Sequence, residues 1–259
     1  MTIHQADAHA KINLVLAVTG SRDDGYHTLR SVFLRLALRD RLSVQLDASA
    51  RADHLTIDGE LDASDDNLVL RAASHMRAAL DPSLPALRFT LRKRIPAAAG
   101  LGGGSSDAAA AIDLALAAWG VRLHPAERLE AALQLGADVP FFAAGHAAAL
   151  VEGIGEHIVP LPAPGPPAGL VLVTPCERLS TAAVFAEYDR VAQAISPAEE
   201  RTDEVAALLR ERVDGMTLAA ITPMLREAND LWAAAVRLSP DLPSARDAAS
   251  RILGRPLLL

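Results

Sequence analysis

Cysteine is almost absent from this chain, since Cys176 is the only one among 259 residues. A single thiol can form neither a disulfide within the chain nor a cysteine metal cluster, which is typical of a reducing compartment. Long apolar runs are absent too: none approaches the ~20 residues that span a bilayer, and no charged segment precedes an apolar one at the N-terminus. We therefore expect a cytoplasmic protein with no membrane partner.

An excess of positive charge is also missing. Lys and Arg number 25 against 32 Asp and Glu, which gives a formal net charge of -7. This balance argues against nucleic acid or an anionic membrane as the main partner, so no nucleic acid is expected. One local basic patch remains, formed by Arg88, Arg92, Lys93 and Arg94. It is either a solvated strand face or part of an anion site.

The composition is that of an ordinary globular protein, with 51% hydrophobic and 22% charged residues. The length allows one large domain or two modest ones. Prolines crowd the segment from residue 160 to residue 167, and we interpret this segment as the crossover between two lobes. The predicted domains are therefore residues 1–162 and residues 163–259.

A glycine-rich stretch organises the chain. Leu87, Phe89 and Leu91 alternate with polar residues, which predicts a strand before the glycines, and residues 107–119 have the composition and spacing of a helix after them. Four glycines among residues 100–104 can turn backbone N–H groups toward one point beside a helix N-terminus, which suits a phosphate. A flexible connection is the alternative. The stretch lacks the Gly-Lys-Ser/Thr of a Walker loop and the spacing of a dinucleotide fingerprint.

The rest of the chain opens with strands and closes with helices. Besides the strand before the glycines, strands are expected at 8–18, 31–36, 42–46, 54–57, 146–151 and 170–174. Helices are expected at 67–80, 107–119, 125–135, 181–193, 203–213, 223–238 and 243–253. Asp65 or Asp66 could cap the first of these helices. The final run, Arg255 to Leu259, is apolar and strand-like.

A phosphate loop without a Walker lysine needs a cation, a metal and a base from elsewhere. Lys11, inside an apolar strand, is the candidate cation, although such a lysine can also extend to solvent. Asp138 is the candidate base, although it could instead cap a helix that Pro140 begins. Tyr26 could stack on a planar ligand. Other polar residues could contact the ligand or a metal, or could cap helices: Asn67, Ser105, Ser106 and Asp107.

Together these segments resemble a known family. Residues 96–107, Pro-Ala-Ala-Ala-Gly-Leu-Gly-Gly-Gly-Ser-Ser-Asp, are similar to the phosphate-binding motif of the GHMP kinases, the superfamily of galactokinase, homoserine kinase and mevalonate kinase. Within it, four shorter segments resemble the branch that acts on 4-diphosphocytidyl-2-C-methyl-D-erythritol in non-mevalonate isoprenoid biosynthesis: residues 10–14, 25–27, 66–68 and 135–140. The resemblance covers nearly the whole chain. It implies an α+β, two-lobed GHMP kinase fold, with the glycine loop and helices in a β-rich N-terminal lobe and an α+β C-terminal lobe.

The resemblance also implies roles for residues. An ATP-dependent transfer to the 2-hydroxyl of the cytidine substrate would use Asp138 to take the hydroxyl proton and Lys11 to orient the hydroxyl, a pair that acts through positioning. Cytosine would lie between Tyr26 and Phe185, although a phenylalanine on a helix can also be a core residue. The implied substrate-binding residues are Asn13, Tyr26, His27, Thr181 and Phe185.

ATP and Mg²⁺ are the implied cofactors. The phosphates would lie in the backbone cradle of Pro96, Ala97, Ala98, Ala99, Gly100, Leu101, Gly102, Gly103, Gly104, Ser105 and Ser106. Asn67 would lie near adenine, and Ser105 is the candidate metal ligand. The implied partner is a small-molecule substrate with a cytidine diphosphate group, bound by a monomer or a homodimer.

One departure from the family pattern concerns the end of the chain. Family members carry a third glycine-rich motif, Ser-Gly-x-Gly, after a segment that resembles residues 254–259, where this chain ends. We therefore expect an incomplete C-terminal lobe that lacks its last strands. Two other hypotheses remain open: a catalytically impaired remnant that binds nucleotide or substrate, and a sister kinase acting on homoserine or mevalonate. The pair Tyr26 and Phe185 favours the cytidine substrate, because aliphatic alcohols need no stacking rings.

Overall fold

A computed structural model describes residues 2–62, 64, 66–165, 169–173, 179–191, 197–212, 214–226 and 228–254. The chain divides into two compact units. Unit 1 holds Met1–Lys11, Arg35–Ala97 and Leu101–His146, and unit 2 holds Ile12–Leu34, Ala98–Gly100 and Ala147–Leu259. Strands β1 (His4–Ser21) and β2 (His27–Asp47) contribute residues to both units. The domain boundary expected at residue 162 stays a prediction.

The sheet of unit 1 confirms the period-2 pattern seen before the glycines. Its strand order is β4 (Glu60–Asp62), β3 (His54–Ile57), β5 (Ala86–Arg92) and β2, with β1 also paired to β2. Strands β2 and β5 are antiparallel, and Val44 lies opposite Phe89. Leu87, Phe89 and Leu91 are buried while the residues between them are exposed. One face of β5 therefore belongs to the core and the other faces solvent.

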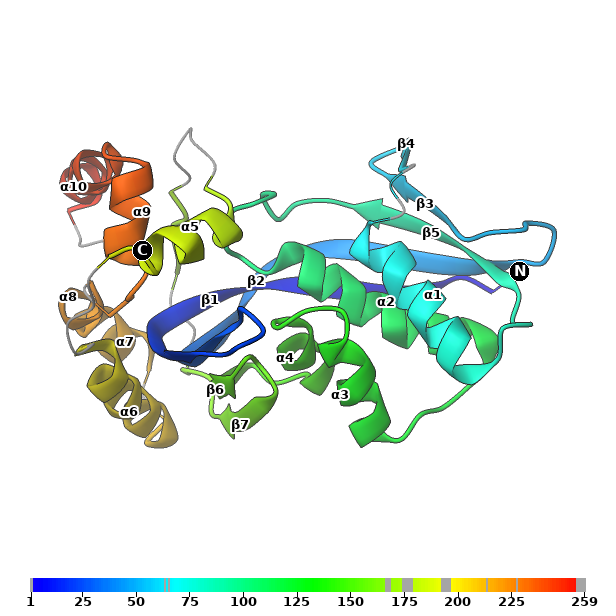
Figure 1. The fold of residues 1–259 in the computed structure, drawn as a ribbon, viewed down its shortest axis with the longest axis horizontal. Helices are drawn as coiled ribbons and strands as arrows, with labels where there is room; N and C mark the ends of the chain where they lie inside the picture. Colours follow the sequence, from blue (N-terminus) through cyan, green and yellow to red (C-terminus); the bar gives the residue numbers. More distant parts are fainter. Residues whose placement is uncertain are drawn as a thin grey trace. The chain divides into compact units, whose positions relative to one another are not determined.

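Four helices cover the core face of this sheet (Figure 1): α1 (Leu68–Leu80), α2 (Gly103–Trp119), α3 (Pro125–Leu133) and α4 (Val139–Ala144). Helix α2 contacts each of the other three. Its alanines Ala108, Ala111 and Ala115 are fully buried, and their small side chains let the neighbouring backbones approach closely. The core joins them to Leu42, Val44, Leu55, Met76, Phe89 and Ile112. This packing fixes the start of α2 relative to the end of β5.

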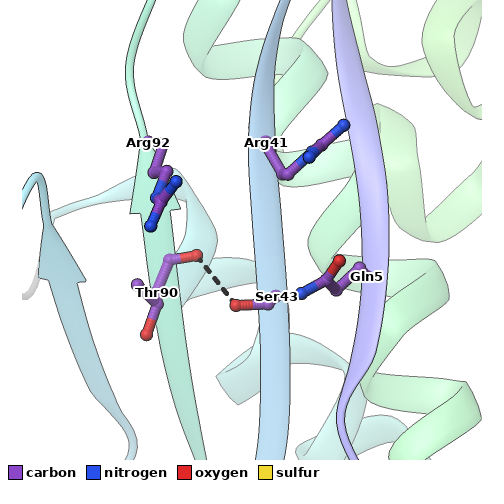
Figure 2. A pocket seen from close by; sticks show the side chains of 5 residues that line it. All are labelled: Gln5, Arg41, Ser43, Thr90 and Arg92. Atoms are coloured by element: carbon purple, nitrogen blue, oxygen red, sulfur yellow. Dashed lines mark hydrogen bonds between the residues drawn. The ribbon is translucent and has the colours of Figure 1, made fainter.

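The solvent face of the same sheet carries part of the basic patch. A pocket of about 210 Å³ is lined by Gln5, Arg41, Ser43, Thr90 and Arg92, whose side chains Figure 2 shows. Arg41 lies directly opposite Arg92 in the strand register. Arg41 also forms an ion pair with Asp7, at 3.3 Å, and Arg88 forms one with Asp47. Both arginines of β5 therefore lie on a solvated strand face.

Unit 2 has its own strands and helices. Strand β6 (Ala148–Gly153) pairs antiparallel with β2 and with β7 (His157–Leu161). The helices are α5 (Thr181–Tyr188), α6 (Pro197–Arg210), α7 (Gly215–Ala220), α8 (Thr222–Leu225), α9 (Trp232–Leu238) and α10 (Leu242–Leu253). Arg30 connects β2 to β6 and α6. Its guanidinium bonds Glu152 of β6 at 2.8 Å and Asp203 of α6 at 2.6 Å.

Several expected elements differ from the observed ones. The strands expected at 31–36 and 42–46 are one strand, β2, because no Gly or Pro interrupts it and its two parts pair with different neighbours, β6 and β5. The single helix expected at 223–238 is wrong: α8 and α9 are separated where residues 228–230 bond Leu16 of β1. Strands β4 and β7 and helices α4 and α7 were not expected.

The prediction of a strand at 170–174 is also wrong for the residues of this segment that the structure describes. Leu170–Val173 belong to no strand and are solvent-exposed, and Thr174 lies outside the described residues. Cys176 and the strand-like run Arg255–Leu259 also lie outside them. Within the described chain, none of the helices has the length and apolarity needed to cross a bilayer.

Candidate active site

The glycine loop ends in the N-terminus of a long helix. Helix α2 begins at Gly103, four residues earlier than expected, so the last two glycines form its first turn. Its first intrahelical bond runs from Ser106 N to Gly102 O, at 2.9 Å. The N–H groups of residues 103–105 precede that bond, and no side chain in the described chain caps this end. Such a terminus presents N–H donors and a positive dipole end to an anion.

Gly102 allows two other elements to approach the loop. Its φ is +67°, in the left-handed region, and an added Cβ would lie 3.0 Å from the Phe142 ring and 3.1 Å from Lys11 Cγ. Lys11 N also donates to Leu101 O at 2.9 Å. The backbone of β1 and the first helix turn after Asp138 are therefore packed directly on the loop, which places Lys11 beside the helix N-terminus.

Lys11 and Asp138 meet at this loop. Lys11 is buried, and its Nζ lies 3.5 Å from Asp138 Oδ2. The lysine does not extend to solvent, which excludes the alternative role considered for it. Asp138 occupies the N-cap position of α4, but its side chain makes no capping hydrogen bond in the described structure and stays 31% exposed. The carboxylate is therefore within reach of an incoming hydroxyl group.

The remaining residues of the cradle differ in exposure. Pro96, Ala97 and Ala98 are exposed, Leu101 and Ser106 are buried, and Ser105 is half-buried. Ala98 has a φ of +55° and Gly100 a φ of +70°, so the backbone turns sharply twice before α2.

Asn67 caps α1, because its side-chain oxygen accepts from Val69 N at 3.0 Å. The cap expected at Asp65 or Asp66 is therefore replaced by Asn67.

A buried charged cluster supports the loop from inside unit 1. Lys93 Nζ lies 2.5 Å from Asp40 Oδ2 and 2.8 Å from Asp107 Oδ2. Burial raises the pKa of Asp107 to about 7, although the Lys93 ammonium acts in the opposite direction. Burial alone would lower the pKa of Lys93, but the two carboxylates outweigh it and raise that pKa. Sequence reasoning missed Asp40, because an acid inside a strand gives no local signal of a distant lysine.

A second group of predicted residues gathers in unit 2. His27 Nε2 lies 2.7 Å from Asp189 Oδ1, and its ring stacks on Phe185 with centroids 4.8 Å apart and planes at 21°. Tyr188 contacts the same imidazole edge-on, at 6.0 Å. Tyr26 is exposed beside His27. Asp189 and Tyr188 were not predicted, because only the folded chain brings α5 to the start of β2.

The last two predicted residues of unit 2 have different surroundings. Asn13 donates through Nδ2 to Ser31 Oγ at 2.8 Å, and Ser31 donates to Val15 O at 2.5 Å. Thr181 is exposed in the first turn of α5, next to the N-cap Ser180. Asn13 of β1 is thus bonded to β2, whereas Thr181 is open to solvent.

Comparison with known proteins first identifies the broad family to which part of the chain is similar. Residues 67–146 match the family described as GHMP kinases N terminal domain. The fold is shared with a mevalonate pyrophosphate decarboxylase from Streptococcus pyogenes, with a TM-score of 0.69, 12% identity and coverage of 98% of this chain and 83% of that one. Residues 67–146, which include the glycine loop, therefore match the GHMP kinase N-terminal domain, and the chain shares its overall fold with this structure.

More similar relatives define the branch. A 4-diphosphocytidyl-2-C-methyl-D-erythritol kinase of Pelotomaculum thermopropionicum is 40% identical over 94% of this chain and 92% of its own length, and that of Gluconacetobacter diazotrophicus is 39% identical over 93% and 77%. A solved 4-(cytidine 5'-diphospho)-2C-methyl-D-erythritol kinase matches with a TM-score of 0.68 and 31% identity, over 99% of this chain and 86% of that one. The chain belongs to the family of 4-diphosphocytidyl-2-C-methyl-D-erythritol kinases. It is an ATP-dependent small-molecule kinase, and the predicted α+β fold class is confirmed.

Proposed function

We propose that the chain transfers the γ-phosphoryl group of ATP to the 2-hydroxyl of 4-diphosphocytidyl-2-C-methyl-D-erythritol. The observation that carries the proposal is the pair Lys11 and Asp138, 3.5 Å apart and packed against a glycine loop that begins a helix. A phosphate site alone would describe a binding protein. An ammonium and an accessible carboxylate beside it supply what an alcohol needs to attack phosphorus.

The reaction assigns one role to each group. Asp138 accepts the hydroxyl proton, the alcohol oxygen bonds to the γ-phosphorus, and the bond from that phosphorus to the bridging oxygen breaks to release ADP. Lys11 orients the hydroxyl and offsets the negative charge of the phosphoryl group. The N–H groups at the start of α2 hold the phosphates, as part of a cradle that spans residues 96–106. Asn67 is assigned to the adenine side.

Mg²⁺ is expected to accompany the nucleotide. Among the described residues, no group of three or more His, Cys, Asp or Glu side chains could hold a metal ion by itself. Mg²⁺ in kinases is commonly held by substrate phosphates and waters with few protein ligands, which fits the half-buried hydroxyl of Ser105. When bound, the ion supplies charge neutralisation for the phosphates.

The cytidine group is assigned to unit 2. The supporting observation is the aromatic cluster of His27, Phe185 and Tyr188, with Asp189 fixing the imidazole and Tyr26 exposed beside it. Flat rings of this kind suit a nucleobase. Asn13 and Thr181 are assigned to the polar parts of the same substrate.

The test is a reaction of the purified chain with ATP, Mg²⁺ and the cytidine substrate, followed by ³¹P NMR. A new phosphomonoester signal together with ADP is expected, with no product from mevalonate or homoserine. Phosphorylation of either aliphatic alcohol in preference to the cytidine compound would identify a sister kinase. Nucleotide binding without turnover on any of the three alcohols would indicate a non-catalytic remnant.

The proposal also includes the location of the protein in the cell and its oligomeric state. We expect a cytoplasmic protein, because the substrate and ATP are both small charged molecules that do not cross membranes unaided. A monomer or a homodimer is expected, and light scattering coupled to size-exclusion chromatography would measure the mass. A larger assembly would contradict this part of the proposal without affecting the chemistry.

A further inference from the structure

The cluster of Asp40, Lys93 and Asp107 is among the most buried groups of charges in unit 1, and the proposed chemistry gives it no role. Asp40 is fully buried within β2, and Asp107 is only 3% exposed. Removing charges from water is costly, and a buried ion pair is often no more stable than apolar side chains of similar volume. Stability alone therefore does not explain why these three charged side chains are buried together.

Asp40 bonds three consecutive residues that lead from β5 toward the glycines. Its Oδ1 accepts from Arg94 N at 2.5 Å and from Ile95 N at 2.8 Å, and its Oδ2 accepts from Lys93 Nζ at 2.5 Å. Backbone N–H groups bonded to a carboxylate are held more strongly than groups bonded to a neutral acceptor. One side chain thus fixes the direction in which the chain leaves the sheet.

Lys93 extends this link to the helix. Its Nζ donates to Asp107 Oδ2 at 2.8 Å, one turn inside α2. An added Cβ on Gly103 would lie 3.4 Å from the same Nζ and 3.0 Å from Ile95 Cγ2. Lys93 and Ile95 therefore occupy the space that the missing side chain of Gly103 leaves. The end of β5 and the first turns of α2 are joined by one network on the inner side of the loop.

We propose that Asp40 and Lys93 are positioning residues that hold the glycine loop in its phosphate-accepting shape before ATP binds. The inference rests on the proposed function only in assigning the loop to ATP. Neither side chain has to touch the nucleotide, because the network acts through Arg94, Ile95 and Gly103. A loop that is already ordered binds a phosphate chain without the entropic cost of ordering it.

The test compares Lys93→Met and Asp40→Asn with the wild type by calorimetric titration with a non-hydrolysable ATP analogue and Mg²⁺. We expect the dissociation constant to rise about tenfold in both variants, a change equivalent to the loss of one charge-assisted hydrogen bond. In steady-state kinetics the KM for ATP should rise while the KM for the alcohol substrate stays unchanged. Lys93→Arg, which keeps the charge and the donors, should restore most of the affinity.

A matched control lies at the other end of β5. Asp53 is also a buried carboxylate, and it bonds both Leu87 N at 2.8 Å and the guanidinium of Arg77 at 2.5 Å. Asp53→Asn should lower thermal stability as much as Asp40→Asn does, yet leave the affinity for the ATP analogue unchanged.

Two outcomes would overturn the inference: unchanged analogue affinity in folded Lys93→Met, or equal loss of affinity in Asp53→Asn. Lys93→Met and Lys93→Arg keep the test decisive if Asp40→Asn does not fold. The analogue titration needs no alcohol substrate. It therefore stands even if the proposed phosphorylation reaction is not observed.

Discussion

The chemistry of Asp138 depends on the residues around its carboxylate, not on its position at the start of a helix. Its carboxylate is accessible and lies beside a buried ammonium, whereas Asp40 and Asp107 in the same unit are enclosed and bonded to Lys93. Only an accessible carboxylate can take a proton from a substrate and release it again. Asp138 therefore has a different chemistry from Asp40 and Asp107.

Asp138→Asn should abolish most turnover while leaving the fold intact. The amide keeps the size and shape of the carboxylate but cannot accept the hydroxyl proton, so kcat should fall by about 10²- to 10⁴-fold. Binding of the ATP analogue should remain near wild type, because in the described structure the Asp138 side chain makes no capping hydrogen bond to α2. Wild-type-like kcat in this variant would remove Asp138 as the base.

Phe185→Leu should weaken binding of the cytidine substrate. The ring stacks on His27 at 4.8 Å, and losing an aromatic partner of this kind should raise the KM for the cytidine compound roughly 2- to 10-fold. The KM for ATP should not change. Val184→Ala, on the same helix but in the core, is the control and should lower stability alone. Equal KM values for Phe185→Leu and wild type would place this ring outside the substrate site.

At the scale of elements, the glycine loop depends on how closely β1 and α4 approach it. Gly102→Ala should impair both folding and activity, since the left-handed φ costs an L-residue about 1–2 kcal/mol and the methyl group would meet Phe142 and Lys11. The change in kcat/KM and in the free energy of unfolding should be measured together.

Gly120→Ala is the matched control for this change. Gly120 ends α2 with a φ of +69°, but an added Cβ there would meet nothing within 4 Å. The Gly120→Ala variant should lose stability through backbone strain alone and keep its kcat/KM. Equal kinetic effects in the two alanine variants would show that backbone strain, not contact with Lys11, accounts for the loss.

The solvent face of the unit 1 sheet has an unfavourable charge pair. Arg41 and Arg92 lie directly opposite, and like charges in that arrangement cost a few tenths of a kcal/mol to about 1 kcal/mol. In the described structure no carboxylate is ion-paired with Arg92. Arg92→Thr should therefore raise the free energy of unfolding by about 0.5 kcal/mol at low salt, and by less at high salt.

Arg88→Thr, two residues earlier on the same strand, should have the opposite sign, because it removes the ion pair with Asp47. Denaturant titrations of both variants at two salt concentrations would measure the difference. Destabilisation by both substitutions would show that Arg92 has a favourable role on this face.

At the scale of the whole molecule, burial of Asp107 links stability to pH. Its pKa is about 7 in the folded chain against the ordinary 3.8, so the folded state binds more protons than the unfolded state between these values. The free energy of unfolding should therefore fall as pH rises from about 4 to about 7 and level off above that, with a slope of at most about 1.4 kcal/mol per pH unit.

The comparison variant for this prediction is Asp107→Asn, which cannot titrate. Denaturant titrations without nucleotide or Mg²⁺ should show a smaller decline with pH in Asp107→Asn than in the wild type. Parallel pH profiles would mean that Asp107 titrates alike in the folded and unfolded chains.

Much of the fold was predictable because its signals are local. The alternation in β5, the helical spacing of α1 and the glycine-to-helix transition each occupy fewer than about 20 consecutive residues, a range over which period and turn residues act. The continuity of β2 was not predictable, because it depends on pairing with β5 and β6 at different positions. The break between α8 and α9 likewise depends on a distant strand, β1.

The sequence by itself determined the family, the phosphate loop and the identity of Lys11 and Asp138 as candidates, because motif residues are contiguous and keep their spacing in any fold. Only the tertiary structure decided that those two side chains meet, that Asp40 and Lys93 join β5 to α2, and that Asp189 fixes His27. Such contacts join residues far apart along the chain. Their geometry depends on how the strands and helices pack, which no short stretch of sequence specifies.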